Sequence, residues 1–367
     1  MKLMLGSLVF LVLAAVIAAD CPAAKGFEGK PTEAFIACNA TFCKDAGDVL
    51  LVPVGDVNDD GFEDLVCHKG SGLIHVALNT KQGGFSSDGN PAEGIENGWC
   101  KGPKQVVFVG DFDGDNRADL LCHSYQTGSK DVRLRNESGN SYSNPTVEEA
   151  TLVGWCILAN AELHVADFDG DGKADLLCHH NGTGAKWLAK SKLPQNGFVQ
   201  TQYAPIGWCF HATSKLYVAD TNGDASSDIL CHDDQGTTWI IKSIECSDQT
   251  AACSTQFDTS DAHTIKGHGI CPGNTLGHMP RYHLIDFNGD GEADHYCHKT
   301  TPEQDNCVLT GSLAGSGANE DCAWQSGANY CNNEGDLLIF GHFFGTRRDD
   351  ILCVRGNTYH LLRNHGL

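Results

Sequence analysis

Residues 167–179 read DFDGDGKADLLCH, and this stretch decides how the whole chain is organised. Acidic residues stand at its positions 1, 3, 5 and 9, and glycines stand at positions 4 and 6. Near-copies recur at intervals of 53 to 66 residues, beginning at Asp56, Asp111, Asp220, Asp286 and, in a copy that has lost most of its acids, His342. Repeats of this period are typical of solenoids, propellers and repeat arrays.

Each copy lies in a longer unit with a constant order of features. A Gly-Phe element such as NGFVQ opens the unit, and a cysteine follows, as in GWC at residues 154–156. The segment LHVA (163–166) precedes the acidic loop, and the segments DLLCH and KWLAK (186–190) follow it. Four short strands without a helix are typical of a β-propeller blade. We therefore expect an all-β, disulfide-rich protein in which residues 20–367 form one β-propeller of six blades, or of seven if the longer fifth unit contributes two.

The acidic stretches also resemble a known family. VGDFDGDNRADLL and VADFDGDGKADLL are similar to FG-GAP/VCBS repeats, which also occur in integrin α-subunits. This resemblance implies a propeller that binds calcium in the hairpin between two strands of a blade. The Cys-His pair that ends each loop strand is similar, more weakly, to secreted invertebrate poly-cysteine and histidine-tailed proteins.

The loop spacing itself predicts calcium. Calcium prefers six to eight oxygen ligands in flexible geometry, and a loop with oxygens at alternate residues wraps them around one centre. An EF-hand is excluded because position 12 is a cysteine and the flanks are strands. About five calcium sites are expected, with these ligands: Asp56, Asn58, Asp60 and Asp64; Asp111, Asp113, Asp115 and Asp119; Asp167, Asp169, Asp171 and Asp175; Asp220, Asn222, Asp224 and Asp228; Asp286, Asn288, Asp290 and Asp294.

The sites are not expected to be equal. Asparagine at position 3 removes a charge from the first, fourth and fifth loops, and Ala225 in the fourth disfavours a left-handed turn. The sixth loop places His342, Phe344 and Thr346 at positions 1, 3 and 5, so we expect it to be free of metal, with an arginine in the place of the cation.

A pair of cysteines recurs in every unit, 22 to 26 residues apart. One precedes the strand before the loop and the other lies near the end of the strand after it, so both fall at the end of the hairpin away from the metal. We expect six disulfides: Cys43–Cys67, Cys100–Cys122, Cys156–Cys178, Cys209–Cys231, Cys271–Cys297 and Cys331–Cys353. The remaining cysteines are expected to pair locally as Cys246–Cys253, Cys307–Cys322 and Cys21–Cys38.

Two further residue types recur beside these cysteines. A histidine follows the second cysteine in five units, at His68, His123, His179, His232 and His298. These histidines either form a transition-metal surface or contact the next turn. The tryptophans of GWC, Trp99, Trp155 and Trp208, either stack on sugars or pack between blades.

The sequence also predicts a compartment. Residues 1–19 have the basic start, apolar stretch and small-residue end of a secretory signal peptide. Eighteen cysteines and three glycosylation sequons, at Asn39, Asn136 and Asn181, agree with a secreted, extracellular protein without a membrane span. The formal charge of −22 argues against nucleic acid as a partner.

No catalytic motif is found, so we expect a non-enzyme. The first functional hypothesis is a binding or adhesion module for an extracellular protein or glycan. The alternative is a metal-handling protein for calcium, or for zinc or nickel through its histidines, in which ion binding is itself the role.

Overall fold

Six four-stranded antiparallel sheets and no α-helix make up the described residues of the computed structural model. Those residues are 36–39, 42–43, 45, 47–51, 55–81, 84–86, 90–92, 94–137, 141–143, 152, 154–201, 207–244, 257, 263–265, 271, 281–298, 306–310, 324–325, 331, 333, 336–355 and 358–364. The predicted signal peptide, residues 1–19, lies outside them.

Strands that follow one another in the chain are neighbours in each of the first five sheets. From the innermost strand outward, these sheets are as follows: sheet 1, β2 (Val49–Leu50), β3 (Leu65–His68), β4 (Ile74–Ala77) and β5 (Asn90–Pro91); sheet 2, β6 (Gln105–Gly110), β7 (Asp119–Ser124), β8 (Lys130–Arg135) and β9 (Tyr142–Ser143); sheet 3, β10 (Ala161–Ala166), β11 (Asp175–His180), β12 (Lys186–Ser191) and β13 (Phe198–Thr201); sheet 4, β14 (Lys215–Ala219), β15 (Asp228–His232), β16 (Thr238–Ile241) and β17 (His263–Ile265); sheet 5, β18 (Arg281–Ile285), β19 (Asp294–His298), β20 (Cys307–Leu309) and β21 (Trp324–Gln325).

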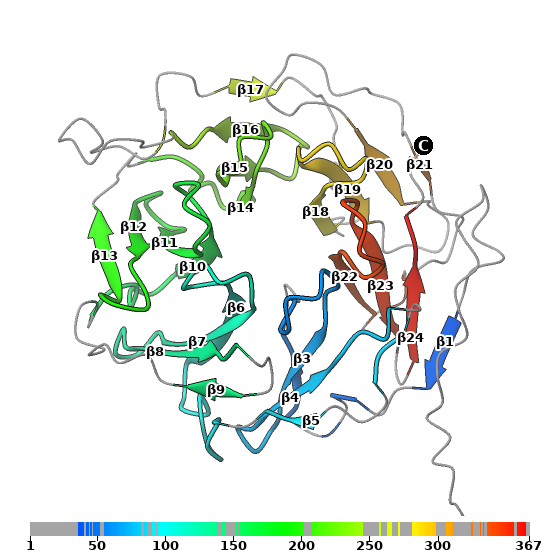
Figure 1. The fold of residues 1–367 in the computed structure, drawn as a ribbon. Helices are drawn as coiled ribbons and strands as arrows, with labels where there is room; N and C mark the ends of the chain where they lie inside the picture. The colour runs from blue at the N-terminus through cyan, green and yellow to red at the C-terminus, as the bar shows by residue number, and fades with distance from the viewer. Residues whose placement is uncertain are drawn as a thin grey trace, which may run out of the picture.

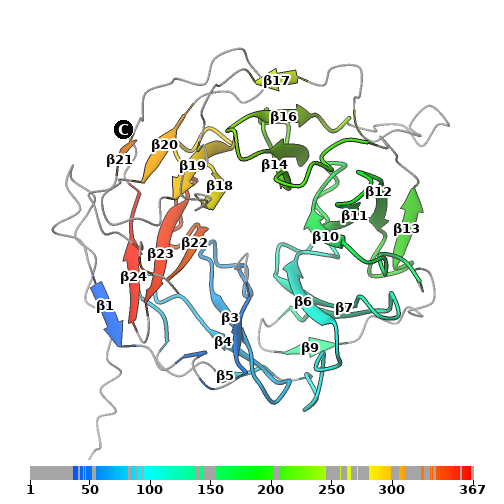
Figure 2. The ribbon, with the colours of Figure 1, turned by 180° about the vertical axis from the view of Figure 1, so that it is seen from behind.

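Sheet 6 joins two distant parts of the chain. It consists of β22 (Leu337–Gly341), β23 (Asp350–Arg355), β24 (Thr358–Leu362) and, at its outer edge, β1 (Ile36–Asn39). Both ribbon views show β1 beside β24 (Figures 1 and 2). The Gly-Phe elements therefore do not open the sheets. Phe198, for example, begins β13 and so ends sheet 3 instead of starting sheet 4.

The strand after each acidic loop is buried on both faces, which explains its apolar sequence. Every residue of β7, β15 and β19 is buried. Each hydrophobic cluster is shared by two consecutive sheets, and one of them joins Leu352 of sheet 6 to Leu65 of sheet 1. The sheets therefore stack face to face in a ring around a central axis (Figure 1).

Backbone hydrogen bonds connect the acidic loops in the same cyclic order. In each case the N–H at loop position 8 donates to the carbonyl at position 1 of the preceding loop. The pairs are Ala118 to Asp56, Ala174 to Asp111, Ser227 to Asp167, Ala293 to Asp220, Asp349 to Asp286, and, across the closure, Glu63 to His342. The first five N···O distances are 2.6–2.8 Å and the closing one is 3.4 Å.

The all-β expectation is confirmed, and the described residues form six sheets without a seventh. The six predicted disulfides are all present with the expected partners. Cys307 is also disulfide-bonded, whereas Cys21, Cys246, Cys253 and Cys322 lie outside the described residues.

Candidate metal centre

The aspartate at position 1 shapes each of the five acidic loops. In sheet 3, Oδ1 of Asp167 accepts the N–H groups of Asp169 and Gly170 at 3.2 and 2.8 Å, and its Oδ2 accepts that of Gly172 at 2.8 Å. This turn requires left-handed backbone at positions 4 and 6, where Gly170 and Gly172 have φ of 71° and 81°. The loop thus curls around its first carboxylate.

Sheet 4 forms the same turn in spite of its alanine. Ala225 has φ of 66°, and its N–H donates to Oδ2 of Asp220 at 2.8 Å. The left-handed turn therefore forms although alanine disfavours it, and the weaker calcium site expected in this loop stays a prediction. Two hydrogen bonds to Asp220, from Gly223 and Ala225, hold the alanine in a conformation that it disfavours in isolation.

The side chain at loop position 3 has the environment of a cation ligand in sheets 1, 2 and 3. One oxygen of each of these side chains is buried and accepts no hydrogen bond: Asn58 Oδ1, Asp113 Oδ1 and Asp169 Oδ1. A buried oxygen without a partner is costly unless a donor or a cation satisfies it. These oxygens therefore fit a bound metal ion.

Carboxylates also converge in sheets 2 and 3. Oxygens of Asp111, Asp113 and Asp115 lie within 4.8 Å of one another, as do oxygens of Asp167, Asp169 and Asp175. Hard oxygen ligands of this kind suit calcium. The donor set in these loops therefore fits calcium.

In sheets 4 and 5 the side chain at loop position 3 is an asparagine that is hydrogen-bonded to the aspartate at position 5. The Nδ2 group of Asn222 donates to Asp224 Oδ2 at 2.8 Å, and that of Asn288 donates to Asp290 Oδ2 at 2.7 Å. A cation entering either loop competes with this contact. We therefore expect these two loops to bind calcium more weakly than sheets 2 and 3.

The aspartate at position 9 has a second role that sequence reasoning missed. In sheet 2 the fully buried Asp119 accepts the N–H of Phe112 at Oδ2 and that of Arg135, at the end of the third strand, at Oδ1. Sheet 6 repeats this pattern with Asp350, although its loop has lost the other acids. Position 9 therefore ties the loop to the third strand whether or not a metal site is present.

Burial strongly affects these position 9 acids. It raises the pKa of Asp119 to about 8 and that of Asp64 to about 7, and neighbouring loop carboxylates add to both increases. A bound divalent cation would favour the ionised form and oppose these shifts.

Basic side chains that the sequence analysis did not single out lie beside the loops. Lys190 approaches Asp169 at 3.0 Å, Lys81 approaches Asp60 at 3.2 Å, and Arg117 pairs with Asp115. In the sixth loop, Arg348 donates through Nε to the carbonyl of Asn288 in sheet 5. The expected arginine thus reaches toward the preceding loop.

Comparison with known proteins bears on these loops directly. Residues 56–122 match the family described as FG-GAP-like repeat. This segment resembles an FG-GAP-like repeat. It runs from the first acidic loop to the second cysteine of sheet 2, and the later acidic loops repeat its pattern in the remaining sheets. A search of curated proteins found no match.

Solved structures share the fold of this chain. A lectin of Agrocybe aegerita, described as recognising non-reducing terminal N-acetylglucosamine, is similar with a TM-score of 0.57 and 16% identity, over 87% of this chain and 81% of the lectin. The Tc holotoxin pore of Photorhabdus luminescens is similar with a TM-score of 0.57 and 13% identity, over 89% of this chain but only 14% of the toxin chain. At these identities the likeness is one of fold.

The opposite end of each repeat is held by its disulfide. The first cysteine of every pair has a left-handed backbone, with φ between 47° and 59°, which sequence reasoning did not foresee. The Cys-His histidines connect these ends from sheet to sheet. Nε2–H of His123 donates to the carbonyl of Cys156, that of His179 to Cys209 and that of His298 to Cys331, at 2.7–3.2 Å.

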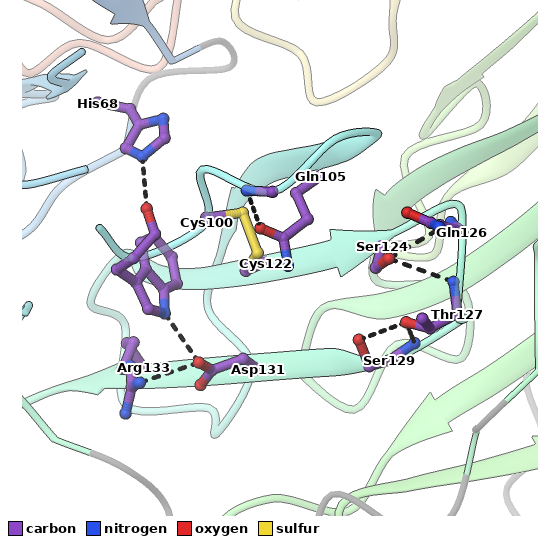
Figure 3. The surroundings of a disulfide bond; sticks show 12 residues. His68, Cys100, Gln105, Cys122, Ser124, Gln126, Thr127, Ser129, Asp131 and Arg133 are labelled. Atoms are coloured by element: carbon purple, nitrogen blue, oxygen red, sulfur yellow. Dashed lines mark hydrogen bonds and ion pairs between the residues drawn. A yellow bond between two sulfur atoms is a disulfide. The ribbon is translucent and has the colours of Figure 1, made fainter. Parts of the chain in front are cut away.

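Sheets 1 and 6 follow the same scheme with small changes. His68 donates to the carbonyl of Trp99, next to the Cys100–Cys122 disulfide (Figure 3). Sheet 6 has Val354 in place of the histidine, and the hydroxyl of Tyr359 donates to the Phe42 carbonyl of sheet 1 at 2.8 Å instead. The histidines therefore contact the next turn, and none of them belongs to a group of three potential metal ligands among the described residues.

Acid is expected to destabilise the protein through these buried histidines. Burial lowers the pKa of His123 to about 4 and that of His179 to about 3, whereas an unfolded histidine titrates near pH 6.5. Below pH 6.5 the unfolded chain gains protons that the folded protein does not bind. Stability therefore falls with pH from about 6.5 to about 4 for His123 and to about 3 for His179, at up to about 1.4 kcal/mol per pH unit for each.

Thermal melting of the protein and of His179→Gln, from pH 7 to 4.5 in excess calcium, measures this effect. Glutamine can still donate to the Cys209 carbonyl but does not titrate. The stability gap between the two proteins is expected to shift in favour of His179→Gln as the pH falls. A gap that stays constant with pH would contradict the prediction.

The predicted glycosylation sites lie in different settings. Asn181 is exposed in a turn of sheet 3, Asn136 is half-buried after β8, and Asn39 ends β1. Glycosylation at these positions stays a prediction. Among the described residues, no helix is long and apolar enough to cross a membrane.

Proposed function

We propose that the protein is a secreted, calcium-binding β-propeller of six blades that works as a non-enzymatic binding module for an extracellular protein or glycan. The ring of six sheets and the cyclic hydrogen bonds between loops support six blades. The disulfides support an oxidising, extracellular compartment.

The observation that carries the calcium proposal is the buried Oδ1 atom of Asp169 without a hydrogen-bond partner. It belongs to a loop in which two further carboxylates, those of Asp167 and Asp175, lie within 4.8 Å. Asp113 repeats the arrangement in sheet 2. In this proposal calcium is held by side-chain oxygens at loop positions 1, 3, 5 and 9 and fixes the hairpin at the end away from the disulfide.

A binding role agrees with the rest of the molecule. The loop acids are accounted for by metal and backbone contacts, and the described paired cysteines by disulfides, which leaves no catalytic group to assign among them. The likeness to an N-acetylglucosamine-recognising lectin supports carbohydrate as the first ligand class to test. That support rests on fold analogy.

A metal-handling role is the second candidate. The Asn222–Asp224 and Asn288–Asp290 contacts favour it, because cation entry must break them and so lowers affinity at sheets 4 and 5. Weak sites near extracellular calcium concentrations would buffer or sense the ion, whereas tight sites would serve the structure.

Metal analysis of the protein equilibrated in millimolar calcium, with the free ion subtracted, tests the calcium proposal. Five calcium ions per chain are expected, and Asp169→Ala is expected to remove one of them because it deletes a ligand of sheet 3. Thr346→Ala in the sixth loop is the matched control and should leave the stoichiometry unchanged. Two or fewer ions in the unaltered protein would show that the acidic loops are only turns.

A glycan array and a pull-down from extracellular proteins, each with calcium and with chelator, test the binding role. A reproducible ligand that is lost when calcium is removed would support it. If calcium binds stoichiometrically and tightly but neither screen yields a ligand, the binding role fails while the calcium sites stand.

A further inference from the structure

A cavity of about 320 Å³ opens beside the disulfide of sheet 3. Its wall includes Leu152, Trp155, Leu158, Trp187, Gln200 and the Cys156–Cys178 disulfide, and none of its described lining residues is charged. This volume is at the lower end of the range for small-molecule sites, roughly 300–1,000 Å³. The cavity is remote from the acidic loops in its sheet, because the disulfide closes the opposite end of the hairpin.

Trp155 in this wall has a hydrogen-bond donor that nothing satisfies. The side chain is 7% exposed, and its Nε1–H is buried without an acceptor. A buried donor left unpaired costs about 1–3 kcal/mol, so a native protein rarely keeps one without a reason.

In sheet 2 the corresponding tryptophan does have an acceptor for its Nε1–H. There the corresponding tryptophan, Trp99, donates through Nε1 to Asp131 Oδ2 at 2.9 Å, and Arg133 holds that carboxylate in turn (Figure 3). Asp131 lies opposite Cys122 on β8, and Trp187 lies opposite Cys178 at the same place on β12. Sheet 3 has therefore exchanged the acceptor of its tryptophan for a second indole ring.

These features define the chemistry of a ligand. Two indole rings suit a molecule with an apolar face, because aromatic rings offer large flat surfaces for packing. The exposed amide of Gln200 can both donate and accept at the rim. Since none of the described lining residues is charged, a neutral ligand is favoured over an ion.

We propose that this cavity, bounded by Trp155 and Trp187, binds one neutral pyranose ring, with its C–H face against indole and a hydroxyl group at the amide of Gln200. The inference rests on the proposed binding function and names the site and ligand class for it. Leu158, which is 51% exposed at the rim, would contact the next sugar or the aglycone.

The test uses the full calcium-loaded protein and a panel of neutral methyl glycosides, with and without a 2-acetamido group. Methyl glucuronide serves as the charged comparison, and aromatic tripeptides form a separate arm. Isothermal titration and tryptophan fluorescence are expected to show one saturable site for at least one neutral glycoside, and weaker binding of the glucuronide.

Trp187→Asp is the decisive variant, because it copies sheet 2 and supplies Trp155 with an acceptor. It is expected to keep its melting temperature and to lose glycoside affinity by at least 50-fold. The matched control is Trp239→Asp, at the same position opposite Cys231 in sheet 4, which should leave affinity unchanged. If Trp187→Asp does not fold, Gln200→Ala at an exposed position should still weaken binding about 5-fold or more.

The outcomes separate this inference from the proposed function. Glycoside binding that survives both Trp187→Asp and Gln200→Ala would overturn the assigned cavity but leave a glycan-binding module. Binding of tripeptides without any glycoside would overturn the ligand class and leave a binding module for proteins. If no probe of either kind binds, the site inference fails, while calcium stoichiometry still decides the metal sites independently.

Discussion

Removal of calcium with EGTA is expected to lower the melting temperature by roughly 5–15 °C without unfolding the protein at 25 °C. Extracellular calcium modules have dissociation constants around 10⁻⁴–10⁻³ M, so each occupied site adds roughly 0.4–1.4 kcal/mol at millimolar calcium. Five sites would contribute roughly 2–7 kcal/mol together. The carboxylates that converge in sheets 2 and 3 would also repel one another without the ion.

The disulfides explain why collapse is not expected. Each of the six described bridges closes a hairpin of 22 to 26 residues at the end away from its loop. A closure of that size contributes roughly 3 kcal/mol in the chain-entropy model. Differential scanning calorimetry in calcium, in EGTA and in magnesium measures the loss of melting temperature on calcium removal. Magnesium is expected to restore little of that loss. A melting temperature that ignores EGTA would contradict calcium-stabilised loops.

Asp350→Ala is expected to destabilise the protein by about 2–6 kcal/mol, equally in calcium and in EGTA. Asp350 is fully buried and accepts the N–H of Asn364 at 2.7 Å and that of Phe344 at 2.9 Å. Alanine leaves both donors without this acceptor, at about 1–3 kcal/mol each. Because the sixth loop lacks the acids at positions 1, 3 and 5, the loss should not depend on metal.

Asp169→Ala is the matched comparison, since its carboxylate is assigned to a calcium site. Its cost should be roughly 0.4–1.4 kcal/mol in calcium and smaller in EGTA, where there is no ion to lose. Urea unfolding of both variants under both conditions gives the four values needed. An Asp350→Ala effect that disappears in EGTA would show that position 9 acts mainly through metal, even in sheet 6.

The sequence was most informative where chemistry recurs at fixed spacing. Acids at alternate loop positions and a cysteine pair in every unit are visible without a structure, and the cysteine pairs indeed form the bridges expected from them. The same spacing could not separate the two roles of Asp175. Its position 9 suits a metal ligand, yet its oxygens also accept the N–H groups of Phe168 and Ser191, and Ser191 lies on a different strand of the sheet.

Two other features depend on contacts that a repeat pattern does not contain. A periodic sequence does not mark where one sheet stops and the next starts, so Phe198 could be assigned to either. Tyr359 takes the place of the missing sixth histidine from a neighbouring strand, which only the pairing of β23 with β24 brings into reach. The cavity at Trp187 was hidden for a similar reason, because its meaning depends on the cross-strand position that Asp131 holds in sheet 2.

The mixed origin of sheet 6 has a consequence for how the chain matures. Asn39 pairs with Thr358, so the earliest strand to leave the ribosome finds its neighbour only when the last one has emerged. Until then β24 is absent, and sheets 1 to 5 form an open arc whose first and last faces expose apolar residues such as Leu65. Domains that emerge N-terminus first often fold progressively, but this ring is expected to close only after β24 has emerged. During that interval the open arc would be a client for chaperones, and two open arcs could exchange β1 to form an interlocked dimer.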